Sequence, residues 1–148
     1  MRILPLCLAA STIFAPPAFA TGGFSCSAED ANLAFTAEAG FSYSIGGGLL
    51  NFRGELALPA GLAPKGLEKV ALDPSHLAHD WLHDGELRLL LHAETGEGLP
   101  FASADLVVMT KAGEDETTYE GGYTLILHRA DGDGEQVRRT GTVSCSVG

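Results

Sequence analysis

The segment Thr140-Gly-Thr-Val-Ser-Cys-Ser-Val147 is the most informative part of this chain when it is compared with Phe24-Ser-Cys-Ser27, near the other end. In both segments a cysteine stands between two serines, and an apolar residue precedes the cysteine by two positions. Residues two apart on a strand share a face, so each cysteine is expected to point the same way as its apolar neighbour. We therefore predict two terminal strands of one β domain, joined by a disulfide between Cys26 and Cys145.

The first twenty residues have the features of a secretory signal peptide. A basic start, Met1-Arg2, is followed by an apolar run from Ile3 to Phe14 and by Ala18-Phe19-Ala20 ahead of Thr21. That order of segments is typical of a cleaved export signal. The apolar run is too short for a membrane span, so no stable membrane insertion is expected once the signal has been removed.

Cleavage leaves residues 21–148 as a single β domain, because this length suits one domain and not two. It also removes Cys7, so that the mature chain keeps only Cys26 and Cys145. An even number of cysteines in an exported chain favours a disulfide over the alternative, two free thiols. The predicted location is the periplasm or the outside of the cell.

The charge of the mature chain is strongly negative. Removal of Arg2 from the 9 basic residues leaves 8 against 19 acidic residues, a net charge of −11. This balance argues against nucleic acid and anionic membrane surfaces as partners. Cationic proteins, basic ligands and metal ions remain compatible with it, as does a simple role in solubility.

Alternating apolar and polar residues predict strands along most of the chain. The expected strands cover residues 31–44, 50–58, 67–72, 86–92, 101–110 and 119–128 and the segment from 137 onward. The run 101–110 is apolar at both odd-numbered and even-numbered positions, and it is expected to be a central strand covered on both sides. The predicted fold is all-β and mainly antiparallel, a single small barrel or β-sandwich of about seven to eight strands with one short helix. Glycines within several strands favour the barrel.

The short helix is predicted between Asp73 and Gly85. Asp73 suits an N-cap, Pro74 suits the first helical position, and Gly85 suits the C-terminal stop. Between them, Leu77, Trp81 and Leu82 have the spacing of a small apolar stripe on a helix.

The same segment carries the candidate metal ligands. On a helix, a spacing of three or four residues places side chains on one face, and imidazole and carboxylate groups there could bind zinc or copper. The alternative is a solvated polar face opposite the apolar stripe, and no H-E-x-x-H pattern is present to indicate a catalytic metal centre. The candidate ligands are His76, His79, Asp80 and His83.

No other motif indicates a specific chemistry. Asp131-Gly-Asp-Gly-Glu135 has some resemblance to a calcium loop, but it is better explained as a hairpin turn. The sequence contains no Gly-x-Ser-x-Gly and no nucleotide-binding motif, and no catalytic residue is assigned. The first hypothesis is an exported, non-catalytic module that binds a small ligand or a partner protein without a cofactor. The second is a metal-binding protein that uses the histidine-rich segment, and an enzyme ranks last.

Overall fold

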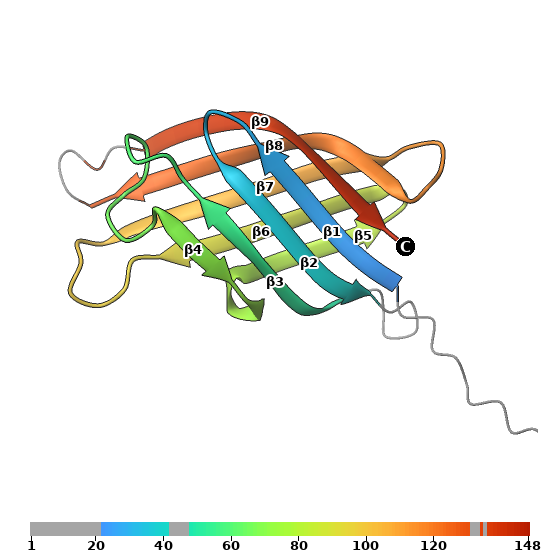
Figure 1. Cartoon of the computed structure of the whole chain (residues 1–148), viewed down its shortest axis with the longest axis horizontal. Coiled ribbons are helices and arrows are strands. Elements are labelled where there is room, and N and C mark those ends of the chain that lie inside the picture. Colours follow the sequence, from blue (N-terminus) through green and yellow to red (C-terminus); the bar gives the residue numbers. More distant parts are fainter. Residues whose placement is uncertain (1–21, 42–47, 131–133, 135) are drawn as a thin grey trace, which may run out of the picture.

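Nine antiparallel strands form one continuous sheet in the computed structural model, which describes residues 22–41, 48–130, 134 and 136–148 (Figure 1). The order of the strands across the sheet is β4-β3-β2-β1-β9-β8-β7-β6-β5. The predicted signal peptide, Tyr43 and the turn at 131–135, apart from Gly134, lie outside the described residues. The strands are β1 (Gly22–Glu29), β2 (Ala34–Phe41), β3 (Leu49–Ala57), β4 (Lys69–Leu72), β5 (Leu77–His83), β6 (Glu86–Glu94), β7 (Ala102–Ala112), β8 (Thr118–Arg129) and β9 (Gln136–Val147).

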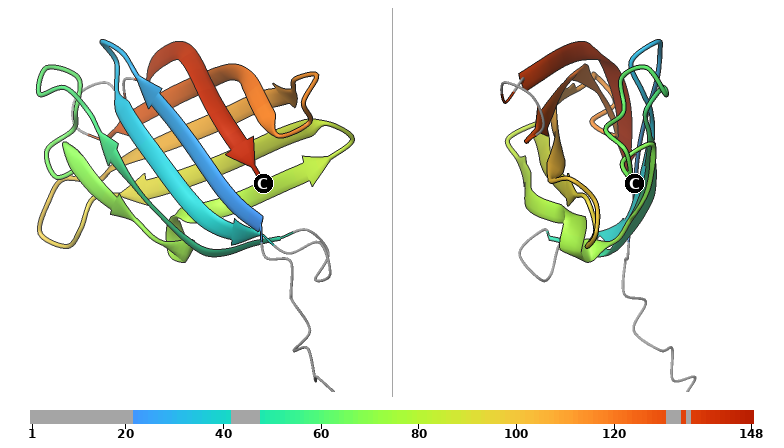
Figure 2. Two further views of the ribbon diagram at one scale, coloured as in Figure 1. Left: turned by 45° about the vertical axis from the view of Figure 1, so that its right-hand side comes forward. Right: turned by 90° about the vertical axis from the view of Figure 1, so that its left-hand side faces the viewer.

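The sheet curls into a half-barrel. Figure 2 shows β1 to β4 on one side and β5 to β8 on the other, with β9 joining the two sides. β9 pairs with β8 over most of its length and with β1 at its C-terminal end, where Ser144 to Val147 face Ser27 to Phe24. The predicted all-β, antiparallel fold is confirmed, with nine strands in place of the seven or eight expected.

The inner face of the curled sheet holds the core. Alternate residues of each strand point inward and pack into one cluster, as the period of two in the sequence predicts. The largest side chains with almost no exposure are Phe35, Phe52, Leu33, Leu56, Leu67, Leu87, Leu91, Leu106, Leu125, Leu127, Val108 and Val143.

The predicted disulfide between Cys26 and Cys145 is present. The two cysteines are directly opposite each other on β1 and β9, with their Cα atoms 4.0 Å apart. Both side chains are buried at 3 % exposure, beside Phe24 and Val143. The bridge therefore joins the first and last strands at the line where the two halves of the sheet meet.

The prediction of a helix between Asp73 and Gly85 is wrong. A single 3-10 turn covers Pro74–His76, capped by the Asp73 carboxylate, and the chain then continues as β5. Asp84 and Gly85 both have positive φ, 52° and 70°, and they connect β5 to β6 as a two-residue hairpin loop. Asp-Gly is a favoured pair for such a loop, so the glycine interpreted as a helix stop is a hairpin signal.

Two predictions of side-chain direction are also wrong. The outer face of β7 is only partly covered, because Met109 on that face is 53 % exposed. The alternation over residues 50–58 also predicts that Leu50 points inward with Phe52, but Leu50 is 39 % exposed. A break in the β2–β3 register between Glu38 and Gly40, together with the positive φ of Asn51, shifts the start of β3 by one residue. No helix among the described residues is long and apolar enough to cross a membrane.

Candidate functional site

The main candidate site is a groove on the outer face of the sheet, directly over the disulfide. Its floor consists of serines on β1 and β9, paired across the strands as Ser25 with Ser146 and Ser27 with Ser144. The Oγ atoms of Ser25 and Ser146 are 3.0 Å apart. These serines are the residues that flank each cysteine in sequence, so the alternation that buries Cys26 and Cys145 also exposes the hydroxyls. We call this feature the seam groove.

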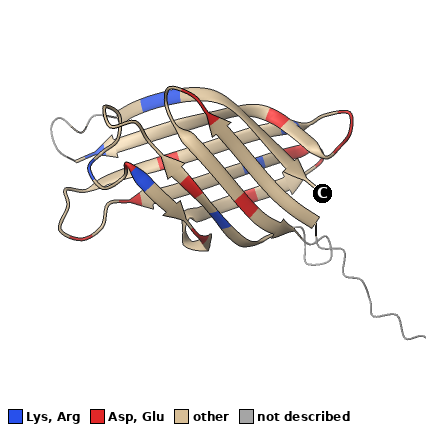
Figure 3. Cartoon of the chain, in the orientation of Figure 1, with Lys and Arg blue, Asp and Glu red and all other residues tan. Residues whose placement is uncertain are grey.

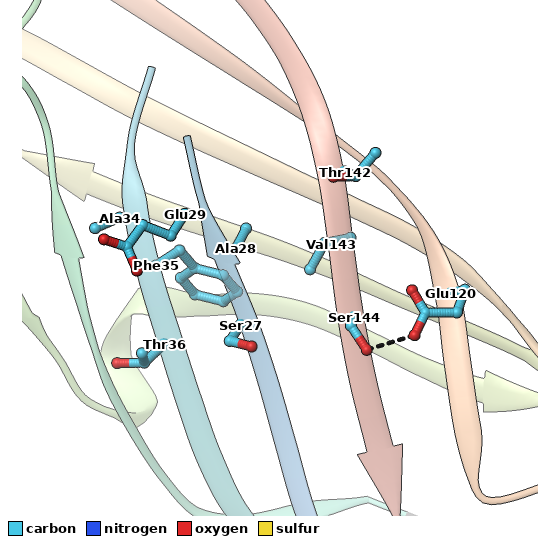
Figure 4. A pocket seen from close by; sticks show the side chains of 10 residues that line it. All are labelled: Ser27, Ala28, Glu29, Ala34, Phe35, Thr36, Glu120, Thr142, Val143 and Ser144. Carbon is cyan, nitrogen blue, oxygen red and sulfur yellow. Dashed lines mark hydrogen bonds between the residues drawn. The ribbon is translucent and has the colours of Figure 1, made fainter. Parts of the chain in front are cut away.

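Larger side chains form the two walls of the seam groove (Figure 4). Thr36 of β2 lies across from Ser27 on one side, and Glu120 of β8 lies across from Ser144 on the other. The Ser144 hydroxyl donates a hydrogen bond of 2.6 Å to the Glu120 carboxylate. The groove is a depression because the short serine side chains of β1 and β9 lie between longer ones, Thr36 and Glu38 on β2 and Thr118 and Glu120 on β8.

The groove is long and shallow. It comprises three depressions of about 280, 490 and 300 Å³ that share lining residues and so run along the strands as one channel. From β2 to β8 there are three strand spacings, a width of roughly 14 Å. An extended chain fits these dimensions, whereas a compact ligand would remain largely exposed.

The charge of the groove is negative. Glu29, Glu38 and Glu120 line it, and Arg53 is the only basic residue among the lining residues of the three depressions, which gives a formal charge of −2. The Arg53 guanidinium lies 2.9 Å from Glu38, so that this carboxylate already has a partner. Glu29 and Glu120 form no ion pair with any described residue. Figure 3 shows acidic positions on several strands on this side of the molecule.

The predicted metal ligands do not share one face. His79 and His83 point outward on β5, on the same side as Trp81, whereas Asp80 faces Leu89 on the inner side. His76 lies in the preceding turn, where its Nδ1 atom is 2.9 Å from the Asp73 carboxylate. In the described ranges, no three or more His, Cys, Asp or Glu side chains are grouped so that they could hold a metal ion. The helical face on which the prediction rested is therefore absent.

An apolar patch on the outer face of β5 to β7 was not predicted from the sequence. Trp81 is 46 % exposed and Met109 is 53 % exposed, and Arg88 lies between them in the cross-strand register. Leu90 and Val107 are half-buried and form the adjacent cross-strand pair. The signal was present in the consecutive apolar residues of β7, which we interpreted as a strand covered on both sides.

A second feature that was missed is a chain of ionisable groups on the same outer face. His92 Nδ1 is 2.6 Å from Asp105 Oδ1, and His92 Nε2 is 3.0 Å from Glu94 Oε1. His128 Nε2 lies 3.9 Å from the other Asp105 oxygen. The hydrogen bond with Asp105, and then that with Glu94, raises the pKa of His92. His92 is thus held between two carboxylates on the outer face of the sheet.

Comparisons of the chain with protein-family models, with curated proteins and with solved structures found no match.

Proposed function

We propose that this chain is an exported, non-catalytic binding module, and that its seam groove binds an extended, positively charged segment of a partner protein. The observation that carries the proposal is the combination of a hydroxyl-lined floor with carboxylates on both walls. Serine and threonine hydroxyls can donate and accept hydrogen bonds, so they suit the polar backbone of an extended chain. Carboxylates only accept when ionised, so they select for cationic side chains.

Charge complementarity supports a cationic partner. The sequence as a whole has a net charge of −10, so the long-range field around the molecule attracts cations and repels anions. Glu120 lies on the β8 wall and Glu29 lies at the end of β1, and neither has a competing cation among the described residues. A lysine-rich or arginine-rich segment along the groove would place one cation near each carboxylate.

The export part of the proposal rests on two features. Residues 1–20 have the order of segments of a cleaved signal peptide. The Cys26–Cys145 disulfide suits an oxidising compartment, since such bonds are uncommon in a reducing cytosol. Expression of the full chain in a bacterium, followed by mass measurement of the exported protein, should give a chain that begins at Thr21. Recovery of the uncleaved chain in the cytosol would contradict export.

The binding proposal is tested by calorimetric titration of the oxidised protein with a capped Lys-Ser-Lys-Ser-Lys peptide at low salt. We expect saturable binding that weakens as the salt concentration rises, because the attraction is screened. Two variants address the two parts of the groove. Glu120→Gln removes a wall charge, and Ser27→Tyr fills the floor without changing the charge; each should weaken binding.

The matched control is Glu97→Gln, which removes the same charge from the exposed loop between β6 and β7, away from the groove. This variant should bind the peptide as the unaltered protein does. Equal weakening by Glu97→Gln and Glu120→Gln would reduce the effect to net charge and contradict a site in the groove. Binding that survives Ser27→Tyr would contradict it as well.

A further inference from the structure

A small pocket at one end of the half-barrel is lined by two basic residues. It is formed by segments that are remote in sequence from the seam serines. Three segments build it: the loop between β3 and β4, the start of β7 with the residues before it, and the last residue of β8. Its volume is about 100 Å³. The lining residues are Ala63, Pro64, Lys65, Pro100, Phe101, Ala102 and Arg129.

Backbone hydrogen bonds hold the three segments in place. The amide of Ala130 donates to the carbonyl of Phe101 over 3.0 Å, which fixes the end of β8 against the start of β7. Ala63 donates to the Pro59 carbonyl over 2.8 Å and so closes the turn that presents Pro64 and Lys65. A pocket that is already formed loses little conformational entropy when a ligand enters.

The guanidinium of Arg129 has hydrogen-bonding capacity that the protein leaves unused. One Nη atom donates to the Leu62 carbonyl over 2.7 Å, which orients the side chain toward the loop. The Nε atom is buried and has no hydrogen-bond partner, the one such side-chain nitrogen or oxygen among the described residues. A buried donor without an acceptor is costly, so the protein does not satisfy all the donors of this guanidinium.

Neither cation of the pocket is neutralised by a described carboxylate. Lys65 and Arg129 form no ion pair in the described ranges, whereas Arg53, Lys69 and Arg88 each pair with a glutamate. Glu68, three residues after Lys65, accepts a hydrogen bond of 2.7 Å from the Gly66 amide. In a chain with 19 acidic residues, the two unpaired cations give this pocket a charge opposite to that of the chain as a whole.

The rest of the lining is apolar, and it indicates the size and polarity of the part of the ligand that is not charged. Pro64 and Pro100 face the pocket, and Phe101 is 53 % exposed beside it. The volume is well below the roughly 300–1,000 Å³ of a pocket for a drug-sized molecule. The space therefore suits a carboxylate with a few carbon atoms, whose apolar part would cover the Phe101 ring.

We propose that this pocket is a binding site for a small organic carboxylate, with Arg129 and Lys65 holding the carboxylate and Phe101 contacting its carbon chain. The site takes a ligand of opposite charge to that of the seam groove and shares no lining residue with it. A test of this pocket is therefore independent of the test of the proposed function.

The test is a nuclear magnetic resonance titration of the oxidised, ¹⁵N-labelled protein with sodium propionate, with sodium chloride at matched ionic strength as the reference. We expect saturable shifts of the Phe101 and Ala102 amides and of the Arg129 Nε–H, and no saturable shift with chloride. Loss of a hydrogen bond to a charged group costs about 1.5–3 kcal/mol, so Lys65→Ala and Arg129→Lys should each weaken binding about tenfold or more.

Lys111→Gln is the control, because it removes one cation from the far end of β7 and leaves the pocket intact. It should bind propionate as the unaltered protein does. Lys65 is an exposed loop residue, so its variant remains informative even where Arg129→Lys disturbs folding. Shifts that do not saturate, or affinity that Lys65→Ala leaves unchanged, would overturn the proposal.

Discussion

The Tyr123 hydroxyl donates a hydrogen bond of 2.6 Å to the Asp30 carboxylate and thereby ties the β1–β2 turn to the middle of β8. Tyr123 is 2 % exposed, and Asn32 from the same turn reaches its hydroxyl at 3.4 Å. The hydrogen bond from Tyr123 is the main cause of the lowered pKa of Asp30. Burial, and then the Asp30 carboxylate, raises the pKa of Tyr123 to about 12.

Removal of either partner of this hydrogen bond should destabilise the fold. Tyr123→Phe and Asp30→Asn are each expected to lower the free energy of unfolding by about 1.5–3 kcal/mol, the range for a hydrogen bond to a charged group. The measurement is urea unfolding at neutral pH. In the double variant the losses should be less than additive, because one interaction is removed in all three variants. Full additivity would show that the two residues do not stabilise the fold through each other.

Gly141 allows this arrangement because it leaves room for the tyrosine ring. A Cβ atom at position 141 would lie 2.5 Å from Cε1 of Tyr123 and would also contact the Asp30 carboxylate. We expect Gly141→Ala to cost about 1–3 kcal/mol, the usual penalty for overpacking. Gly61→Ala is the control, since nothing lies within 4 Å of a Cβ there. Equal midpoints of thermal unfolding for the two variants would refute the steric explanation.

The disulfide should supply a large part of the stability. Cys26 and Cys145 are 119 residues apart in sequence, and the chain-entropy relation gives about 4–5 kcal/mol for a loop of that length. The Cys26→Ser/Cys145→Ser variant should lose stability of this order in urea unfolding. Ser27→Ala/Ser144→Ala alters the neighbouring pair on the same strands and should change stability far less. A loss below about 1 kcal/mol in the cysteine variant would contradict the expectation.

The protonation of His92 should depend on Asp105. The raised pKa means that the folded state binds the proton more tightly than the unfolded state does. The stabilisation is therefore fully present below the unfolded pKa of about 6.5 and is lost as the pH rises through the folded pKa. Glu94 contacts the other ring nitrogen of His92 at 3.0 Å, and His128 Nε2 lies 3.9 Å from the second Asp105 oxygen.

Proton resonance titration of the His92 ring provides the measurement. Asp105→Asn should lower the pKa of His92, because it removes the carboxylate that contributes most to the shift. Asp115→Asn, in the turn between β7 and β8, is the control and should leave the His92 titration unchanged. A His92 pKa that is insensitive to Asp105→Asn would mean that another group determines it.

Trp81 distinguishes the observed strand from the predicted helix. As part of an apolar helical stripe it would be buried, but on β5 its side chain points outward and is 46 % exposed. Its ring packs edge-on against the ring of His83, with 5.7 Å between the two ring centroids. Trp81→Ala should therefore cost about 1 kcal/mol or less, while Phe35→Ala in the core should cost about 3–5 kcal/mol. Chemical denaturation of both variants makes the comparison. A large loss for Trp81→Ala would indicate that this side chain is covered in solution.

Local alternation in the sequence was enough to predict most of the core. Phe24, Cys26, Val143 and Cys145 share the inner face because a strand has a period of two, and no tertiary information is needed to see it. The disulfide followed from the count and position of the cysteines in the chain. The predictions were wrong where one local pattern is compatible with two structures. Asp73, Pro74 and Gly85 suit the two ends of a helix, but they suit a capped turn followed by a hairpin loop equally well.

The strand alternation, the disulfide pair and the acidic balance were predictable from the sequence, since each depends on residue types and on spacing along the chain. The groove floor formed by the serines of β1 and β9, and the pocket lined by both Lys65 and Arg129, are visible only in the folded structure. The same holds for the exposed part of the outer face of β7. These features join residues that are far apart in sequence, so they depend on strand order and sheet curvature, for which a linear pattern carries no signal.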